Sequence, residues 1–193
     1  MKRIHAIYAI LFCLGLLLAA CGSVPPAPVD HFYRLRPVSL ALATPAWPGA
    51  IAVQPFRADS LYAERAIVYS DAADLRQLRQ YHYQLWLYPP AQMTQEHFTA
   101  SVGSMLDLSG GSTAANVLEA RIVAFERVLS GKNSKAVVAL ELRLMTDGKP
   151  LLGKIYRAEQ AAADESLSAF AAAMEDALGR IYAEFVADLG RRR

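Results

Sequence analysis

The stretch VLEARIVAFERVLSGKNSKAVVALELRLMTDGKPLLGKIYRA, residues 117–158, decides the fold of this chain. Apolar and polar residues alternate along it, as they do in strands with one buried face. Two sets of apolar residues each share a face, within 117–129 and 136–145 respectively: Leu118, Ala120, Ile122 and Ala124, then Val138, Leu140, Leu142 and Leu144. Turn signals at 131–134 and at Asp147-Gly148 separate these strands and lead into a third, 151–158. The stretch predicts an antiparallel meander with one buried face.

A long amphipathic helix is expected after the meander. Its apolar residues recur every three or four positions: Leu167, Phe170, Met174, Leu178, Ile181, Phe185 and Leu189. Asp164 and Glu165 precede this stripe and Arg191–Arg193 follow it, so that the charges complement the helix dipole. The basic tail is interpreted as a solvated helix end in preference to a lipid contact.

Weaker patterns fill the region before the meander. Short β-type segments lie at 31–38, 50–56 and 67–70, and 75–83 fits a strand better than a helix. A helix is expected from Pro89-Pro90 to about residue 108, with Ser109–Ser112 as its stop. The fold class is therefore α/β with α+β character. One domain, 31–193, has a mixed and largely antiparallel sheet with two helices, about 90–108 and 165–190, packed on it.

The N-terminus has the pattern of a bacterial lipoprotein signal. Lys2 and Arg3 precede an apolar run that ends in Leu18-Ala19-Ala20-Cys21. We expect residues 1–20 to be removed and the Cys21 thiolate to carry the lipid. Gly22, in place of aspartate, favours sorting to the periplasmic face of the outer membrane. The alternatives are an ordinary signal peptide or a membrane helix, and residues 4–20 are at the short end of the spanning range.

Removal of the signal changes the charge and the cysteine content. Without Lys2 and Arg3, 18 basic residues remain against 18 acidic ones, so charge gives no reason to expect nucleic acid. Cys21 becomes the only cysteine, which excludes a disulfide within the mature chain. Residues 21–30 contain three prolines and are expected to form a lipidated tether with a reach of about 28 Å.

Motifs for enzyme chemistry are incomplete. Gly148–Lys154 has the spacing of a phosphate-binding loop, but Ile155 stands where a hydroxyl is needed and strands are expected on both sides. His31, His82 and His97 lack the spacing of a zinc site and are expected at surfaces or interfaces. We therefore expect no catalytic residue, no metal and no cofactor, although paired carboxylates cannot be judged from the sequence.

An aromatic segment before the first helix is the candidate partner-binding site. Aromatic side chains with a polar group suit interfaces, where one end is dry and the other wet. The alternative is that the segment belongs to the core, and Trp86 is the side chain most expected to be buried. The candidate residues are Tyr81, Tyr83, Trp86, Tyr88, Pro89 and Pro90.

Taken in order, these features resemble the ABC-type transport auxiliary lipoprotein family. The resemblance covers nearly all of the mature chain. Besides the motif at Cys21, the meander and the last helix, it depends on Phe32–Pro37, Ile51–Val53, Glu64–Tyr69, Tyr81–Pro90 and Ala124–Arg127.

The resemblance implies a non-enzymatic periplasmic α/β domain. Its partners would be a mammalian-cell-entry (MCE) protein with a permease and an ATPase, in a system that moves lipids between the inner and outer membranes. It also implies a homo-oligomeric ring at the outer membrane. The alternative is an outer-membrane lipoprotein that assists cell-wall synthesis or lipopolysaccharide assembly, and a periplasmic hydrolase is a third class.

Overall fold

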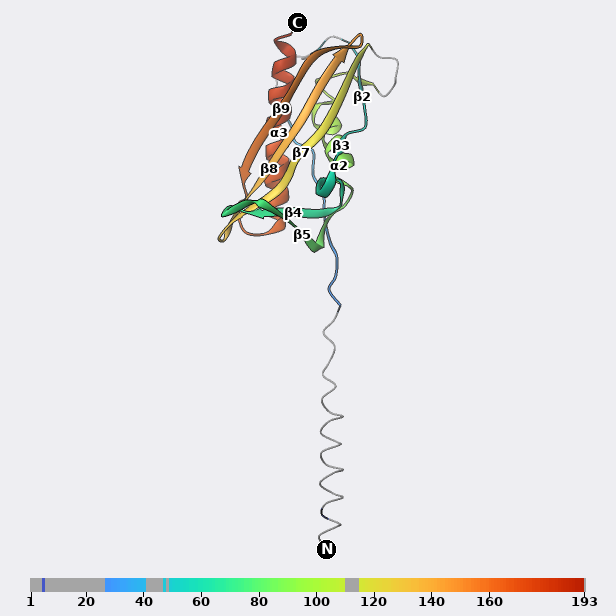
Figure 1. Ribbon diagram of the computed structural model, residues 1–193. Helices are drawn as coiled ribbons and strands as arrows, with labels where there is room; N and C mark the ends of the chain where they lie inside the picture. Colours follow the sequence, from blue (N-terminus) through green and yellow to red (C-terminus); the bar gives the residue numbers. More distant parts are fainter. Residues whose placement is uncertain (1–4, 6–26, 41–46, 48, 110–114, 193) are drawn as a thin grey trace.

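The computed structural model describes residues 5, 27–40, 47, 49–109 and 115–192 (Figure 1). Within that part, nine strands form one mixed sheet, and two helices pack on it. The predicted single α+β domain is confirmed. The lipidation and sorting residues, Cys21 and Gly22, lie outside the described residues.

The predicted meander is present as β7 (Asn116–Ser130), β8 (Asn133–Thr146) and β9 (Lys149–Ala161). Both β7 with β8 and β8 with β9 pair antiparallel over nearly their full lengths. The second turn has positive φ at Asp147 (49°) and Gly148 (73°). Two such residues give the backbone twist that a tight hairpin requires, which is why this dipeptide is a reliable signal.

One extra residue in β7, Val123, changes the predicted faces. Ile122 and Ala124 pair with consecutive residues of β8, so one residue between them has no counterpart. A bulge of this kind shifts the alternation by one position. The prediction that Ala124 shares the face of Ile122 is therefore wrong, and Phe125 takes the core position instead.

The middle of β8 is buried on both faces. Val137 and Ala139, opposite the predicted core face, are as fully buried as Val138 between them. The prediction of one buried face is confirmed near the C-terminal end of β8, where Arg143 is exposed. It is wrong for the middle of β8, an inner strand that pairs with β7 on one side and β9 on the other.

Three short strands line the other edge of β7, all parallel to it. They are β2 (Ile51–Val53), β3 (Arg57–Ala58) and β4 (Ala66–Asp71), and the 3₁₀ helix η1 (Ser60–Ala63) lies between the last two. β4 then forms a hairpin with β5 (Asp74–Trp86), so 75–83 is a strand as predicted, extended at both ends. β6 (Leu108–Ser109) pairs with the outer side of β2.

The first strand, β1 (His31–Tyr33), pairs parallel with the end of β5 and is much shorter than the predicted 31–38. Beyond Tyr33 the backbone groups bond to side chains of the two helices in place of a strand. Pro37 has no N–H to give to a ladder, which also favours an end to the pairing.

The first packed helix, α2 (Pro90–Val102), begins at the predicted proline but ends six residues before the predicted 108. A β-carbon at Gly103 would lie 2.7 Å from the Thr99 carbonyl oxygen, so only glycine fits there. After it the chain turns, and the Asp107 carbonyl accepts a hydrogen bond from the Ile51 N–H (2.8 Å). Pairing of β6 with β2 thus replaces the last predicted helical turn.

The second helix, α3 (Leu167–Gly190), carries the predicted apolar stripe into the core. Ser166 caps its first turn by accepting a hydrogen bond from the Ala169 N–H (3.0 Å). Phe98 of α2 meets Tyr182 and Phe185 of α3, so the two helices and the inner face of the meander share one core. None of the helices in the described ranges is long and apolar enough to span a membrane.

Candidate docking surface

The predicted aromatic segment lies at the end of the domain where the N-terminal residues enter, opposite the C-terminus (Figure 1). Residues 81–86 close β5, residues 87–89 form a turn, and Pro90 begins α2. The register of β1 on β5 places Phe32 beside Leu85 and Tyr33 beside Trp86. The Leu87 N–H extends this ladder to the Tyr33 carbonyl (2.7 Å).

Two of the six candidate residues, Trp86 and Pro90, are buried. Trp86 is 1% exposed and its ring lies 5.4 Å from that of Phe125 and 5.7 Å from that of Phe170. This is the core alternative, and neither residue is available to a partner on the surface.

Tyr81 is half-buried and held in place by its neighbours. Its ring lies 4.4 Å from that of Tyr69, and its hydroxyl accepts a hydrogen bond from Arg127 (3.2 Å). The same guanidinium donates to the Glu165 carbonyl (2.6 Å) and lies over the Phe170 ring. These contacts connect β5, β7 and the start of α3, which makes Tyr81 a structural residue.

The other three candidates, Tyr83, Tyr88 and Pro89, are exposed. Two further exposed apolar side chains lie beside them, Phe32 (51% exposed) on β1 and Leu87 (37%) in the turn, against 44% for Tyr88. Neither Phe32 nor Leu87 is among the six candidate residues. Leu87 lies within the segment, between Trp86 and Tyr88, whereas Phe32 joins it only through the parallel pairing of β1 with β5, in which Phe32 is opposite Leu85.

Two arginines flank this apolar surface. The Arg65 guanidinium lies 5.1 Å from the centre of the Phe32 ring, and its Nε donates to the Trp86 carbonyl (3.1 Å). Arg34 lines a groove of about 390 Å³ whose walls include Leu87, Tyr88 and Glu96. Arg65 thus places its charge over the face of the Phe32 ring, and Arg34 lies in the wall of the neighbouring groove.

Residues 34–40, here called the strap, run from β1 across α2 and α3. The Arg36 N–H donates to Glu175 of α3 (2.8 Å), and the Val38 N–H donates to Ser101 of α2 (3.1 Å). A β-carbon at Gly179 of α3 would lie 3.0 Å from Val38 Cγ2, so the strap packs directly on the helix backbone. Side chains of two helices thus bind the backbone of the segment that follows the tether.

His97 of α2 gives the strap a third bond and is buried, not at a surface as predicted. Its Nε2 lies 3.0 Å from the Arg36 carbonyl, and its Nδ1 lies 3.2 Å from the Tyr182 hydroxyl. Because a carbonyl only accepts, Nε2 carries the proton and Nδ1 accepts from the tyrosine. Burial lowers the pKa of His97 to about 4, so the ring is neutral at pH 7. The other two histidines, His31 and His82, are exposed as predicted.

The segment with phosphate-loop spacing, Gly148–Lys154, lies in the turn before β9 and in β9 itself, paired with β8. A phosphate-binding loop leads from a strand into a helix, so this segment has the wrong surroundings for that chemistry. In the described part of the chain, no three His, Cys, Asp or Glu side chains are grouped to hold a metal.

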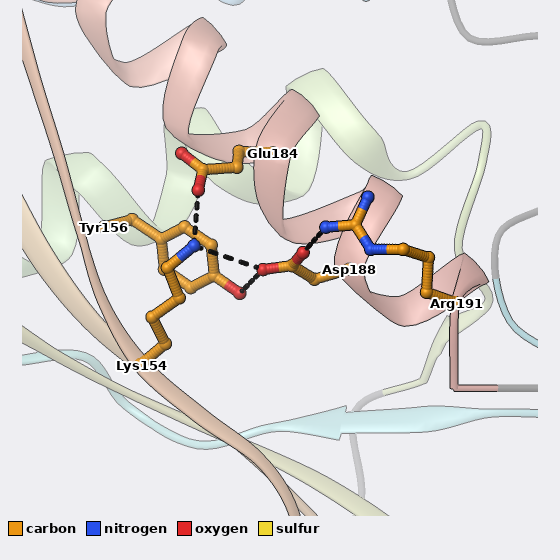
Figure 2. A network of polar contacts seen from close by, with 5 residues as sticks. All are labelled: Lys154, Tyr156, Glu184, Asp188 and Arg191. Carbon is orange, nitrogen blue, oxygen red and sulfur yellow. Dashed lines mark hydrogen bonds and ion pairs between the residues drawn. The ribbon is translucent and has the colours of Figure 1, made fainter.

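A polar network closes the far end of α3 (Figure 2). Asp188 accepts a hydrogen bond from the Tyr156 hydroxyl (2.9 Å) and pairs with Lys154 and Arg191. Lys154 also pairs with Glu184 (2.5 Å). Every group in the network has a partner within it, so it fixes the end of α3 to β9. Arg191, the C-cap of α3, takes part through its ion pair with Asp188.

Comparison with known proteins places the chain by fold. The sequence matches no family model and no curated protein. Its structure is similar to that of protein XCC0632 from Xanthomonas campestris, described under the family model DUF330. The TM-score is 0.72 at 18% identity, over 84% of this chain and 96% of that one.

Two further solved structures are less similar. An uncharacterized protein has a TM-score of 0.64 at 15% identity, over 85% of this chain and 98% of that one. Lipoprotein GNA1162 from Neisseria meningitidis has a TM-score of 0.42 at 10% identity, over 75% and 99%, which is too low to indicate a shared fold. At these identities the comparisons establish architecture only: the chain has the fold of XCC0632.

Proposed function

We propose that this chain is a non-enzymatic lipoprotein that Cys21 anchors to the periplasmic face of the outer membrane. It serves there as the docking subunit of an MCE-type ABC transport system for lipids or other hydrophobic molecules. Its partners are the MCE-domain protein and, through it, the permease and the ATPase. Several copies assemble as a ring.

The direct connection between the lipidation motif and the folded core carries this proposal. Only five residues separate Cys21 from Ala27, where the described chain begins again. From there, β1 is bonded to the sheet, and the strap is bonded to both helices. A domain attached in this way is held at a short and defined distance from its membrane, which suits a subunit that positions a larger assembly.

Two further observations agree with a binding role. Three residues of the aromatic segment are exposed: Tyr83, Tyr88 and Pro89. Two buried polar side chains, His97 and Asp188, are occupied with structural bonds to the strap and to β9.

Capture from crosslinked membranes tests the proposal. The lipidated full-length chain serves as bait, and a Cys21→Ser variant, which cannot be lipidated, is the matched control. We expect an MCE-domain protein with its permease and ATPase, recovered with the lipidated bait and lost with the variant. Recovery of a cell-wall synthase or a lipopolysaccharide-assembly protein in their place contradicts the transport role.

The non-enzymatic part has its own test. The purified mature chain, residues 21–193, is incubated with phospholipid and simple ester substrates, and we expect no turnover above the uncatalysed rate. Turnover that a single substitution abolishes, with the fold intact by circular dichroism, would show that the chain is a hydrolase.

A further inference from the structure

We propose that the tether-end patch, formed by Val29, Phe32, Leu87 and Tyr88, inserts into the interfacial layer of the lipid monolayer that holds Cys21. The inference rests on the lipidation in the proposed function and assigns a ligand to part of the aromatic surface. That ligand is a lipid surface.

The four residues lie at one end of the domain, around the pairing of β1 with β5. Phe32 lies on β1 and Leu87 directly follows the end of β5, and the bond from the Leu87 N–H to the Tyr33 carbonyl joins the chain at this point. Leu87 and Tyr88 share the wall of the groove that Arg34 also lines. Val29 precedes β1 by two residues and is 70% exposed.

Exposed apolar side chains gather at this end of the domain. Among the described residues, seven large hydrophobic side chains are exposed, and five of them fall within residues 29–32 and 83–88. The other two, Leu75 and Ile155, lie apart from them on β5 and β9. Scattered exposed apolar residues need no explanation, but a contiguous group marks an interaction site.

The length of chain to the anchor selects lipid as the occupant. Val29 is eight residues from Cys21, so an extended connection spans at most about 28 Å, and a flexible one averages about 15 Å. The headgroup layer adds roughly 5–8 Å on each side of the hydrocarbon core. The patch is thus the folded surface closest along the chain to the membrane, and the monolayer is always within its reach.

The chemistry of the patch fits an interfacial layer. Tyrosine and arginine place an apolar body in the dry region and a polar end in water. Arg65 stacks on Phe32, and Arg34 borders Tyr88 in the groove, so both charges can remain at headgroup level.

Net charge does not drive this contact. Glu96 lines the groove with Arg34, and Glu64 and Asp30 are close in the sequence to Arg65 and Arg34, so acidic residues accompany both arginines. Apolar insertion should therefore persist at high salt and on uncharged lipid, whereas a purely electrostatic contact would be screened.

Depth-dependent quenching tests the proposal. The mature chain is coupled through Cys21, its only cysteine, to a maleimide headgroup lipid in phosphatidylethanolamine/phosphatidylglycerol vesicles. Tryptophan is introduced by Tyr88→Trp in the patch or by Ile155→Trp on β9 as the matched exposed control. Brominated acyl chains quench tryptophan that contacts them, and the parent chain gives the background from Trp47 and Trp86.

We expect quenching above background for Tyr88→Trp, unchanged at high salt, and none for Ile155→Trp. A second measurement uses the uncoupled chain, in which Cys21→Ser prevents attachment, and follows its partitioning into the same vesicles. The double variant Phe32→Ser/Leu87→Ser should partition about tenfold more weakly. The control double variant, Leu75→Ser/Ile155→Ser, should partition like the parent.

Equal quenching at both positions, or none at either, overturns the proposal and leaves this surface free for a protein partner. The anchor is supplied chemically in this experiment, so its result does not depend on lipidation in the cell or on the transport complex. Membrane capture tests those separately.

Discussion

Trp86→Ala is the most informative single test of the architecture, because Trp86 belongs to the candidate partner-binding segment and the structure gives it the alternative place, in the core. The indole is 1% exposed and lies against the rings of Phe125 on β7 and Phe170 on α3. Truncating a buried tryptophan to alanine costs about 3–5 kcal/mol, and each aromatic pair adds roughly 0.5–1.5 kcal/mol beyond the buried area. We expect a loss of about 4 kcal/mol in the free energy of unfolding.

Urea unfolding of the mature chain, followed by far-ultraviolet circular dichroism, measures this loss without relying on tryptophan fluorescence. Tyr88→Ala is the matched control two residues away. Its ring is 44% exposed, and we expect a change of at most about 0.5 kcal/mol. A loss below about 1.5 kcal/mol for Trp86→Ala, or equal losses for both variants, would refute the assignment of Trp86 to the core.

Three further predictions concern polar groups. The pKa of His97 is lowered to about 4 in the folded chain, so as pH falls below about 6.5 the unfolded chain binds a proton before the folded one does. The free energy of unfolding should therefore drop by about 3 kcal/mol by pH 4. Urea titrations at several pH values measure this, and His97→Gln should remove the dependence. Asp188→Asn should cost about 1–3 kcal/mol, because Tyr156 and Lys154 lose a charged partner near the end of α3; a melting temperature equal to that of the parent would contradict this. Ser166→Ala should cost about 1 kcal/mol through loss of the cap on α3, and Ser166→Asp, which can cap equally well, should restore the thermal midpoint.

The strongest periodic patterns predicted the fold correctly. The meander and α3 follow from alternation and from three-and-four spacing, because each presents an apolar face that only packing can satisfy. The helix begins at Leu167, two residues after the predicted start at 165, because the Ser166 side chain caps its first turn. The sequence alone was sufficient to predict an element where its buried face follows the period of its secondary structure.

Other features depend on contacts between distant residues. The extra residue Val123 cannot be recognised from alternation, because the pattern on either side remains regular. The early end of α2 results from Gly103 and from pairing of β6 with β2. The short β1 results from bonds between the strap and two helices far along the chain.

The candidate site was predicted in part for the same reason. Aromatic content indicated residues 81–90, and the expectation that Trp86 is the buried ring among them is confirmed. Phe32 joins the surface only through the pairing of β1 with β5. His97 was expected at a surface or interface, but it is buried against the Arg36 carbonyl, a contact between distant parts of the chain that no sequence pattern indicates.

The strap also has a mechanical consequence. A pull on residues 27–30 reaches β1 first, and a pull along the axis of β1 loads its bonds to β5 together, in shear. Behind β1, the bonds from residues 36–38 to Glu175, His97 and Ser101 transfer the remaining force to both helices. Force transmitted from the membrane through the tether would therefore be distributed over the sheet and both helices, and would not unfold the N-terminal segment alone.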